Sequence, residues 1–168
     1  LIALGATLTL RRGTDCRTLA LEALYHDYMV NDLRDSEFVA SVQIPPRNAD
    51  QVLACYKISK RFDQDISALC AGFSVTLNDG TIRSARIAFG GMAGTVKRAT
   101  HCEAALQGQP FSLATITAAQ RALADDYTPM SDMRASDGYR RQVAANLLQR
   151  FYLETTGEAQ TDVYNYAR

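Results

Sequence analysis

A turn flanked by two runs of alternating apolar residues constrains this chain more than any other feature. Asn78-Asp79-Gly80 is a strong hairpin signal because Asp and Gly tolerate the backbone angles of tight turns. Apolar side chains occupy alternate positions on both sides of it, at Leu69, Ala71, Phe73, Val75 and Leu77 and then at Ala85, Ile87 and Phe89. This alternation predicts a β-hairpin with one buried face. The positions in between, such as Cys70 and Gly72, are small, which predicts that the other face lies close to a helix or another backbone.

The residues before the hairpin are also typical of strands. We predict strands over Ala6–Arg11, Cys16–Leu21 and Phe38–Ile44, and a further strand that runs through Tyr56. Apolar residues from Leu24 to Met29 instead fall at helical spacing, so we predict a short helix over Leu21–Val30. The best candidate for a linker is Pro45–Asp50, where two prolines stand among polar residues.

Helical patterns fill the remainder of the chain. We predict one helix over Ala99–Leu106, a second that starts after the N-cap residue Ser112, and a third over Ala135–Thr155. Asp125-Asp126 ends the second helix with the wrong charge for the helix dipole, so we expect tertiary contacts to hold that end. Strands, then a hairpin, then helices predict an α+β fold in which an antiparallel sheet packs against C-terminal helices.

Composition and charge exclude several classes of protein. Eighteen basic and eighteen acidic residues cancel, so the chain lacks the basic field that nucleic-acid binding requires. No apolar run approaches the roughly 20 residues of a membrane-spanning helix, and the first residues do not resemble a signal peptide. The four cysteines are widely spaced and there are only two histidines, which predicts reduced thiols in a cytosolic protein and no metal site.

A dense charged segment between two apolar strands, Tyr56–Ser67, is the first candidate site. Asp63 and Asp65 could form an acid/base pair, but cations nearby lower carboxylate pKa values and favour an ion network that orients a ligand. Lys57 is either a cation aimed at an electron-rich ligand atom or a lysine whose stem covers a strand edge. Gly90-Gly91 indicates a bulge or close backbone packing rather than a phosphate loop, because neither nucleotide-binding motif is present.

Several motifs in one order along the chain resemble the FAD-binding small subunit of bacterial xanthine dehydrogenase, and with it the C-terminal domain of molybdenum-hydroxylase flavoproteins. They are Tyr56-Lys57-Ile58-Ser59-Lys60-Arg61, Ile87-Ala88-Phe89-Gly90-Gly91-Met92-Ala93, Lys97-Arg98-Ala99 and Asp132-Met133-Arg134-Ala135-Ser136. The likeness extends over essentially the whole chain. It implies that residues 1–47 are the C-terminal part of an α+β FAD-binding domain and that residues 48–168 are the flavoprotein C-terminal domain.

The resemblance also implies cofactor-binding residues. Lys57 falls on the lysine that contacts FAD in the family, and Val39 aligns with an aliphatic residue that does likewise. Ile58–Ile66 occupies the position of a loop beside the isoalloxazine ring, near the place where NAD⁺ docks. Asp63 and Asp65 would hold Arg61 and Lys60 and tune the field across the ring. No catalytic residue and no metal ligand is expected in this chain.

In the family, electrons pass from two [2Fe–2S] clusters through FAD to NAD⁺ during purine hydroxylation at a molybdenum centre in another subunit. The resemblance therefore implies a cytoplasmic enzyme fragment. Its partners would be the rest of the FAD/iron–sulfur subunit and the molybdenum-binding large subunit, with no nucleic acid and no membrane. The family's glycine-containing FAD loops are missing, so the chain alone is expected to bind FAD weakly and to be inactive. Two alternatives remain: a non-catalytic subunit-docking module, and the flavoprotein subunit of a related enzyme such as carbon monoxide dehydrogenase or 4-hydroxybenzoyl-CoA reductase.

Overall fold

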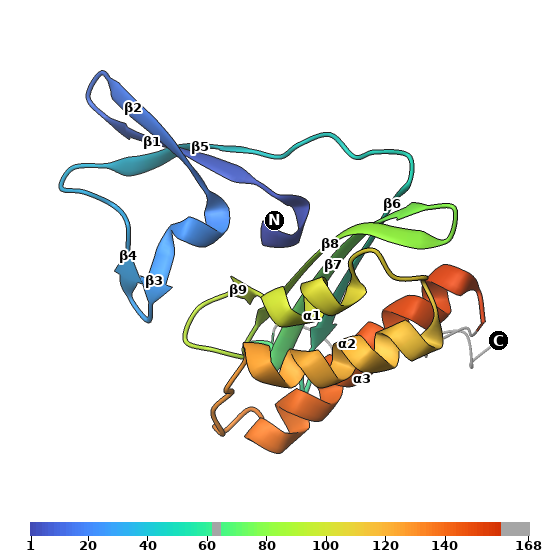
Figure 1. The fold of residues 1–168 in the computed structure, drawn as a ribbon. Helices are drawn as coiled ribbons and strands as arrows, with labels where there is room; N and C mark the ends of the chain where they lie inside the picture. The colour runs from blue at the N-terminus through green and yellow to red at the C-terminus, as the bar shows by residue number, and fades with distance from the viewer. Residues whose placement is uncertain (62–64, 159–168) are drawn as a thin grey trace.

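Two antiparallel sheets and three α-helices dominate the computed structural model, which describes residues 1–61 and 65–158 (Figure 1). The first sheet has the order β2-β1-β5, and the second has the order β6-β7-β8-β9. The strands of these sheets are β1 (Thr7–Arg12), β2 (Asp15–Ala20), β5 (Phe38–Gln43), β6 (Gln51–Ile58), β7 (Leu69–Asn78), β8 (Thr81–Gly90) and β9 (Lys97–Arg98). The helices are α1 (Thr100–Leu106), α2 (Leu113–Asp126) and α3 (Asp137–Thr156). The α+β fold and the hairpin predicted from the sequence are confirmed.

The main core lies between the second sheet and the three helices. Alternate residues of β7 and β8 point into it, so that Phe73, Ile87 and Phe89 are almost completely buried. Phe73 stacks on Phe151 of α3, with ring centroids 5.2 Å apart, and meets Phe89 edge to face. Burial of such rings contributes about 1.5–3 kcal/mol each to folding. The alternation of the hairpin thus fixes which face the helices cover.

The helices begin and end at residues that satisfy their terminal backbone groups. Ser112 and Ser136 are the N-caps of α2 and α3, and their hydroxyls accept hydrogen bonds from the backbone N–H groups of Thr115 and Tyr139. The end of α2 is held as expected, because the Asp126 carboxylate accepts the N–H groups at the start of α1. One carboxylate therefore joins the end of one helix to the beginning of another.

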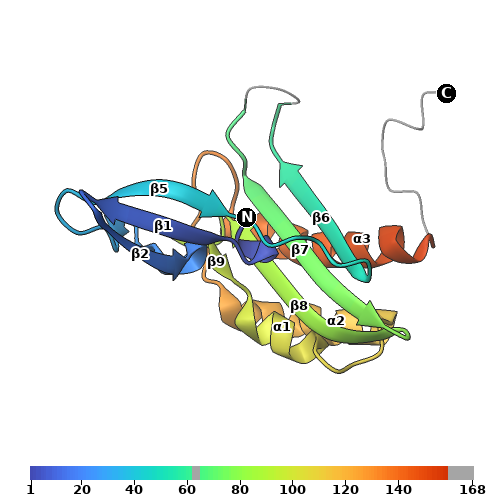
Figure 2. The ribbon, with the colours of Figure 1, turned by 90° about the horizontal axis from the view of Figure 1, so that it is seen from above.

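The first sheet belongs to a smaller N-terminal layer, residues 1–43, called here the N-terminal module. Leu8, Leu10 and Leu24 form its own small core. The module also contains two 3-10 helices, η1 (Ile2–Leu4) and η2 (Leu21–Ala23), and the short strands β3 (Tyr25–Asp27) and β4 (Val30–Asn31). Residues 44–50 connect the module to β6 without a helix or strand. Seen from above, η1 lies across β7 and β8 on the side opposite the helices (Figure 2).

The helix predicted over Leu21–Val30 is wrong. Only Leu21–Ala23 is helical, as one 3-10 turn, and the chain then forms the β3–β4 hairpin. Asp27 closes the turn by accepting the Tyr28 N–H, and Met29 adopts a left-handed φ of 57°. A side chain that bonds its neighbouring backbone competes with helix formation. Tyr28 and Met29 are also exposed, so these apolar side chains do not pack against a core as the side chains of an amphipathic helix would.

No helix of the described residues is long and apolar enough to cross a membrane.

Candidate functional site

The outer face of the second sheet carries a mostly apolar cavity, called here the sheet-face pocket. Its floor consists of the small outward residues of β6, β7 and β8, and its opposite wall consists of the N-terminal module. It measures about 370 Å³ and is lined by Leu1, Ile2, Ala3, Leu21, Tyr25, Cys55, Cys70, Gly72, Ala88, Gly90 and Val96. The lining is therefore mostly apolar, as ligand sites commonly are.

Glycines and small side chains keep this floor flat. A Cβ atom on Gly72 would lie 3.4 Å from the Cβ of Ala3, and one on Gly90 would lie 3.5 Å from Val96. The prediction that the small-residue face lies close to other backbone is thus confirmed, since η1 occupies that place. The neighbouring part of the floor, at Cys55 and Cys70, has room for a ligand.

The two cysteines of the floor lie on neighbouring strands. Cys55 faces Gly72 across the β6–β7 ladder and Cys70 faces Lys57, so the thiols are diagonal neighbours on one face. Burial raises the pKa of the Cys70 thiol, and interaction with Cys55 raises it further, while the Lys57 cation acts in the opposite direction. Both thiols are free.

Lys57 extends from β6 on the same outer face, beside the pocket. Residues 52, 54, 56 and 58 of this strand pack on the core, so the side chain of Lys57 must point the other way. It is exposed, directly opposite Cys70. The strand therefore places a cation at the rim of an apolar floor.

The charged segment continues into the loop after β6. Asp65 accepts the Arg61 N–H at 2.9 Å, and the guanidinium of Arg61 lies 3.5 Å from its second oxygen. The hydrogen bond from the Arg61 backbone lowers the pKa of Asp65, as does the Arg61 charge, against the effect of burial. Asp65 is thus an ion-pair partner, as the sequence analysis favoured. Asp63 lies outside the described residues.

Lys60 is hydrogen-bonded to the loop before α3, and any contact between it and Asp63 lies outside the described residues. Its ammonium donates to the carbonyl of Met133, in the loop before α3, at 2.8 Å. The carboxylate of Asp65 is turned instead toward Arg61. Lys60 and Arg61 both line a second, more polar depression with Asp65, Met133 and Arg134.

Val39 does not join these residues in one site. It lies on β5 in the first sheet, paired with Leu10, and is partly exposed. Lys57, Arg61 and Asp65 belong to β6 of the second sheet and the loop that follows it. The four predicted residues therefore occupy two layers, and none of them is among the residues that line the sheet-face pocket.

A buried arginine of α3 is hydrogen-bonded to the end of the loop after β6. Arg140 of α3, with a side chain 4% exposed, donates to the carbonyls of Ala68 and Gly91 and to the carboxylate of Asp132. A Cβ on Gly91 would lie 2.5 Å from the Ala68 carbonyl oxygen, and its φ is +82°. The prediction of close backbone packing at Gly90-Gly91 is confirmed, and glycine is required there.

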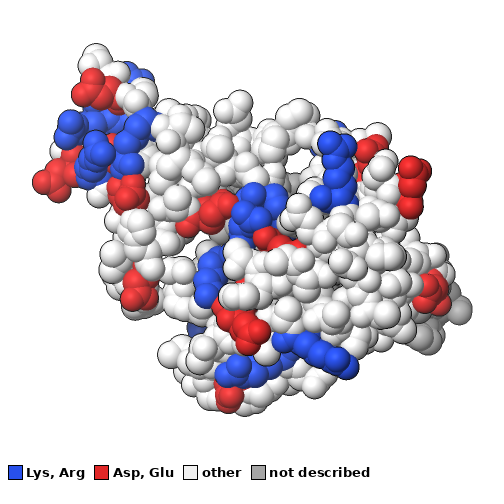
Figure 3. All heavy atoms as spheres, viewed as in Figure 1, with Lys and Arg blue, Asp and Glu red and all other residues white. Residues whose placement is uncertain are grey.

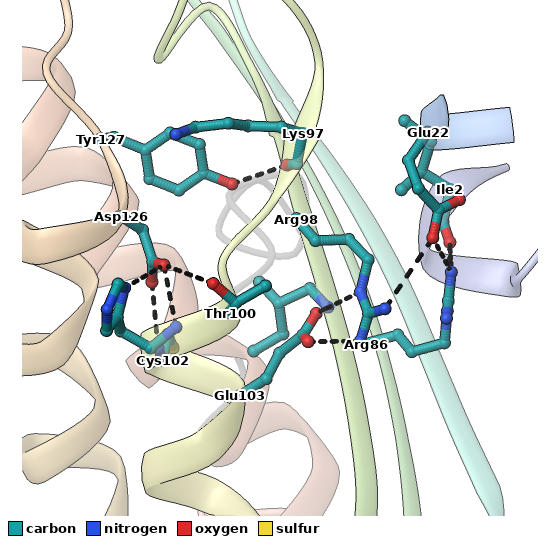
Figure 4. Close-up of polar contacts among 12 residues, drawn as sticks. Ile2, Glu22, Arg86, Lys97, Arg98, Thr100, Cys102, Glu103, Asp126 and Tyr127 are labelled. Carbon is teal, nitrogen blue, oxygen red and sulfur yellow. Dashed lines mark hydrogen bonds and ion pairs between the residues drawn. The ribbon is translucent and has the colours of Figure 1, made fainter. Parts of the chain in front are cut away.

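A series of linked ion pairs joins the N-terminal module to the second sheet (Figure 4). Arg86 of β8 donates to the Ile2 carbonyl at 3.0 Å and to Glu22 at 2.7 Å. Arg98 lies 3.8 Å from the same Glu22 oxygen and bonds Glu103, which also accepts the Ile87 N–H. We call Glu22, Arg86, Arg98 and Glu103 the junction network. Figure 3 shows both signs of charge mixed along this junction.

Sequence reasoning missed the junction network and the cysteine pair. Arg86 and Ile2 are 84 residues apart, so no local pattern connects them. The one available signal was Arg86 itself, a cation between the apolar residues Ala85 and Ile87. The cysteines could have been paired by aligning the two predicted strands, which would have placed Cys55 and Cys70 on the same face.

The fold defines a class of protein, namely an α+β domain in which three helices cover one face of the sheet and a second layer packs against part of the other face. Residues 54–155 match the model of the CO dehydrogenase flavoprotein C-terminal domain. The chain belongs to that family. Residues 1–53 precede the match.

Relatives and solved structures agree with this assignment. The chain is 28% identical over 128 residues to the xanthine dehydrogenase FAD-binding subunit of Escherichia coli O157:H7, covering 76% of this chain and 44% of that protein. It is 29% identical over 159 residues to a nicotinate hydroxylase of Emericella nidulans, covering 90% of this chain and 12% of that protein. The carbon monoxide dehydrogenase structure from Hydrogenophaga pseudoflava superposes with a TM-score of 0.83 at 25% identity, over 89% of this chain and 52% of the other.

The resemblance to xanthine dehydrogenase FAD-binding subunits and molybdenum-hydroxylase flavoproteins, inferred from the sequence, is confirmed. The chain spans about half the length, or less, of the proteins it matches.

Proposed function

We propose that this chain forms the distal part of the flavin subunit of a molybdenum-containing hydroxylase, in which the outer face of the second sheet is one wall of an FAD site. Residues 1–47 would complete the FAD-binding domain, and residues 48–168 would be the C-terminal domain. Electrons would leave the flavin for NAD⁺, with purine hydroxylation at a partner subunit. The observation that supports this proposal most directly is a flat, mostly apolar sheet face in a chain of this family, with the cation of Lys57 directly opposite the lining residue Cys70.

The residues of this face fit the ring end of FAD. The floor around Gly72, Gly90 and Cys55 has no bulky side chain, so a planar ring system could lie against it. Lys57 stands at its edge and could interact with electron-rich ring atoms. Bound FAD supplies two-electron redox chemistry, and a nearby cation favours its reduced, more negative form. This chain's part would be to orient the ring, exclude water from one side and set the local potential.

The loop after β6 would contribute at the opening of the site. Asp65 fixes Arg61, and Lys60 is fixed by the Met133 carbonyl, so two cations are held at the end of the strand that carries Lys57. Fixed cations attract the phosphates of a dinucleotide. This arrangement supports NAD⁺ as the electron acceptor.

The test uses the complete flavin subunit that contains this chain. Lys57→Ala should lower the midpoint potential of bound FAD and slow NADH formation, because the reduced flavin loses a neighbouring positive charge. Arg83→Ala, which removes an exposed cation from the far end of β8, is the matched control and should change neither. Spectroelectrochemical titration measures the potential, and stopped-flow absorbance measures the rate.

The alternative is a docking module without a role at the flavin, and the same variants separate it from the proposal. Exposed apolar side chains on the N-terminal module, including Tyr28, Met29 and Phe38, favour a contact surface there. If Lys57→Ala and Arg61→Ala leave the potential and NADH formation unchanged while assembly of the complex fails, the docking function is correct and the flavin proposal is wrong.

A further inference from the structure

In the function proposed above, the cysteines of the open sheet face contribute only a small side chain to the floor, and their thiol groups suggest a separate chemistry. Cys55 is exposed, Cys70 is partly exposed, and both line the sheet-face pocket. We propose that Cys55 and Cys70 form a two-thiolate binding site for a soft metal ion of the Cu(I) type. The site would belong to this chain alone and would not depend on a bound flavin.

The strand register determines the geometry of the pair. Cys55 pairs with Gly72, and Cys70 pairs with Lys57 two residues along, so the thiols sit on one diagonal of the same face. Diagonal neighbours on antiparallel strands have Cα atoms about 7–8 Å apart, with side chains still in reach of each other. Gly72 has no side chain, so nothing at the position opposite Cys55 separates the two sulfur atoms.

This geometry disfavours a disulfide and suits a bridging ion. A disulfide brings the sulfurs to about 2.05 Å and rarely joins residues whose Cα atoms are more than about 7 Å apart. A thiolate–metal bond is about 2.3 Å long, so one ion between two sulfurs can span up to about 4.6 Å. The pair is therefore better placed to hold an ion than to close a covalent bond.

The number and type of donors select the ion. Among the described residues, no group of three or more histidine, cysteine, aspartate or glutamate side chains could hold a metal, so a tetrahedral zinc site is not formed. Soft thiolates prefer Cu(I), which accepts two sulfur ligands. Binding exchanges two thiol protons for one Cu⁺, so the bound complex carries one net negative charge. Lys57, directly opposite Cys70, places a positive charge beside it.

The experiment titrates the reduced chain with Cu(I) under anaerobic conditions against a chromogenic Cu(I) chelator. We expect one tightly held ion per chain and sulfur-to-copper absorption in the near ultraviolet. Cys55→Ser and Cys70→Ser should each lower the affinity by at least about tenfold, because a hydroxyl is a hard donor. Cys16→Ser removes an exposed thiol on β2 and is the matched control, which should bind as the parent does.

Three results would overturn the proposal: equal affinity in the parent and in Cys55→Ser, loss of the ion in Cys16→Ser, or a Cys55–Cys70 disulfide formed by mild oxidation and seen by mass spectrometry. Melting curves of the metal-free variants verify that each is folded. Since the titration contains no flavin, a negative result here leaves the proposed function intact. A positive result would stand even if Lys57→Ala had no effect on the flavin potential.

Discussion

Arg17 of the N-terminal module binds two carboxylates, those of Asp32 and Glu37. Its guanidinium forms hydrogen bonds with Glu37 at 2.7 and 2.8 Å and with Asp32 at 2.6 Å. The two hydrogen bonds from Arg17 to Glu37, together with one from the Arg34 backbone, lower the pKa of Glu37 from 4.5 to about 2. The same guanidinium lowers the pKa of Asp32. A carboxylate held in this way stabilises the fold only while it is charged.

The first prediction concerns the pH dependence of this contact. Because the folded-state pKa of Glu37 is below its ordinary value, its contribution is complete above about pH 4.5, declines below that, and is lost as the pH falls through about 2. Carboxyl NMR titration should give a Glu37 midpoint near 2 in the parent and a clearly higher midpoint in Arg17→Gln, still below 4.5 because the Arg34 N–H continues to donate to the carboxylate. Arg12→Gln, an exposed control on β1, should leave the midpoint unchanged. A midpoint near 4.5 in the parent would contradict the pairing.

At the scale of elements, the start of α1 is stabilised by a residue of another helix. Asp126 is buried and accepts the backbone N–H groups of His101 and Cys102, both at 2.9 Å, and a ring nitrogen of His101 at 3.0 Å. The N-cap position of α1, Ala99, makes no side-chain cap. A carboxylate at a helix N-terminus also opposes the positive end of the helix dipole. Asp126, the last residue of α2, therefore takes the place of an N-cap side chain at the start of α1.

The second prediction is that Asp126→Ala lowers the free energy of unfolding by about 1–2 kcal/mol, as loss of an N-cap does. Two backbone N–H groups, of which that of Cys102 is buried, would lose their acceptor. Asp125→Ala removes the neighbouring, exposed carboxylate and should change stability by less than about 0.5 kcal/mol. Urea denaturation followed by circular dichroism measures both values. Equal effects of the two substitutions would disprove the capping role.

Sequence patterns predicted the elements that depend on local signals. The β7–β8 hairpin follows from alternation and the Asp79-Gly80 turn, and α2 and α3 follow from serine caps and apolar stripes. Tyr25–Asn31 was missed because apolar spacing suggested a helix, while Asp27 and Met29 turn the chain into a hairpin. The Asp125-Asp126 sequence indicated a tertiary partner but could not identify α1.

The site was predictable only in part, because some of its contacts join residues that are far apart in the sequence. Lys57, Arg61 and Asp65 were singled out by their density of charge, and the pairing of the last two is observed. The junction network required knowledge of how two layers meet, which depends on the path of the chain through residues 44–50. A strand pattern specifies which face is buried but not what covers the other one.

At the scale of the whole molecule, the junction network determines how the two layers meet. Arg86 contacts both η1 and η2, through the Ile2 carbonyl and Glu22, and it lies on the same face as the sheet-face pocket. Its neighbour Arg98 connects the same glutamate to Glu103 of α1. The wall of the pocket that belongs to the N-terminal module is therefore held in place by charged side chains around its edge.

The third prediction follows from this arrangement. Arg86→Met should loosen η1 from the sheet, so that amide hydrogen exchange at residues 1–6 and proteolysis within 44–50 both increase several-fold, with little change in the helices. Arg83→Met, on the same strand but exposed at its far end, is the control. Mass spectrometry of the exchanged and digested chains measures both effects. Unchanged exchange in Arg86→Met would show that Arg86 does not hold the two layers together.

The spacing between Gly72 and Ala3 limits the size of the side chain that position 72 accepts. A Cβ on Gly72 would make an ordinary van der Waals contact with the methyl group of Ala3, at 3.4 Å, so the gap between the layers has room for a methyl group at this position. Side chains larger than alanine at this position, first valine and then leucine, would force the two layers progressively further apart. Such a series would move the N-terminal module away from the sheet in steps. It would show how large a separation between the two layers the fold tolerates.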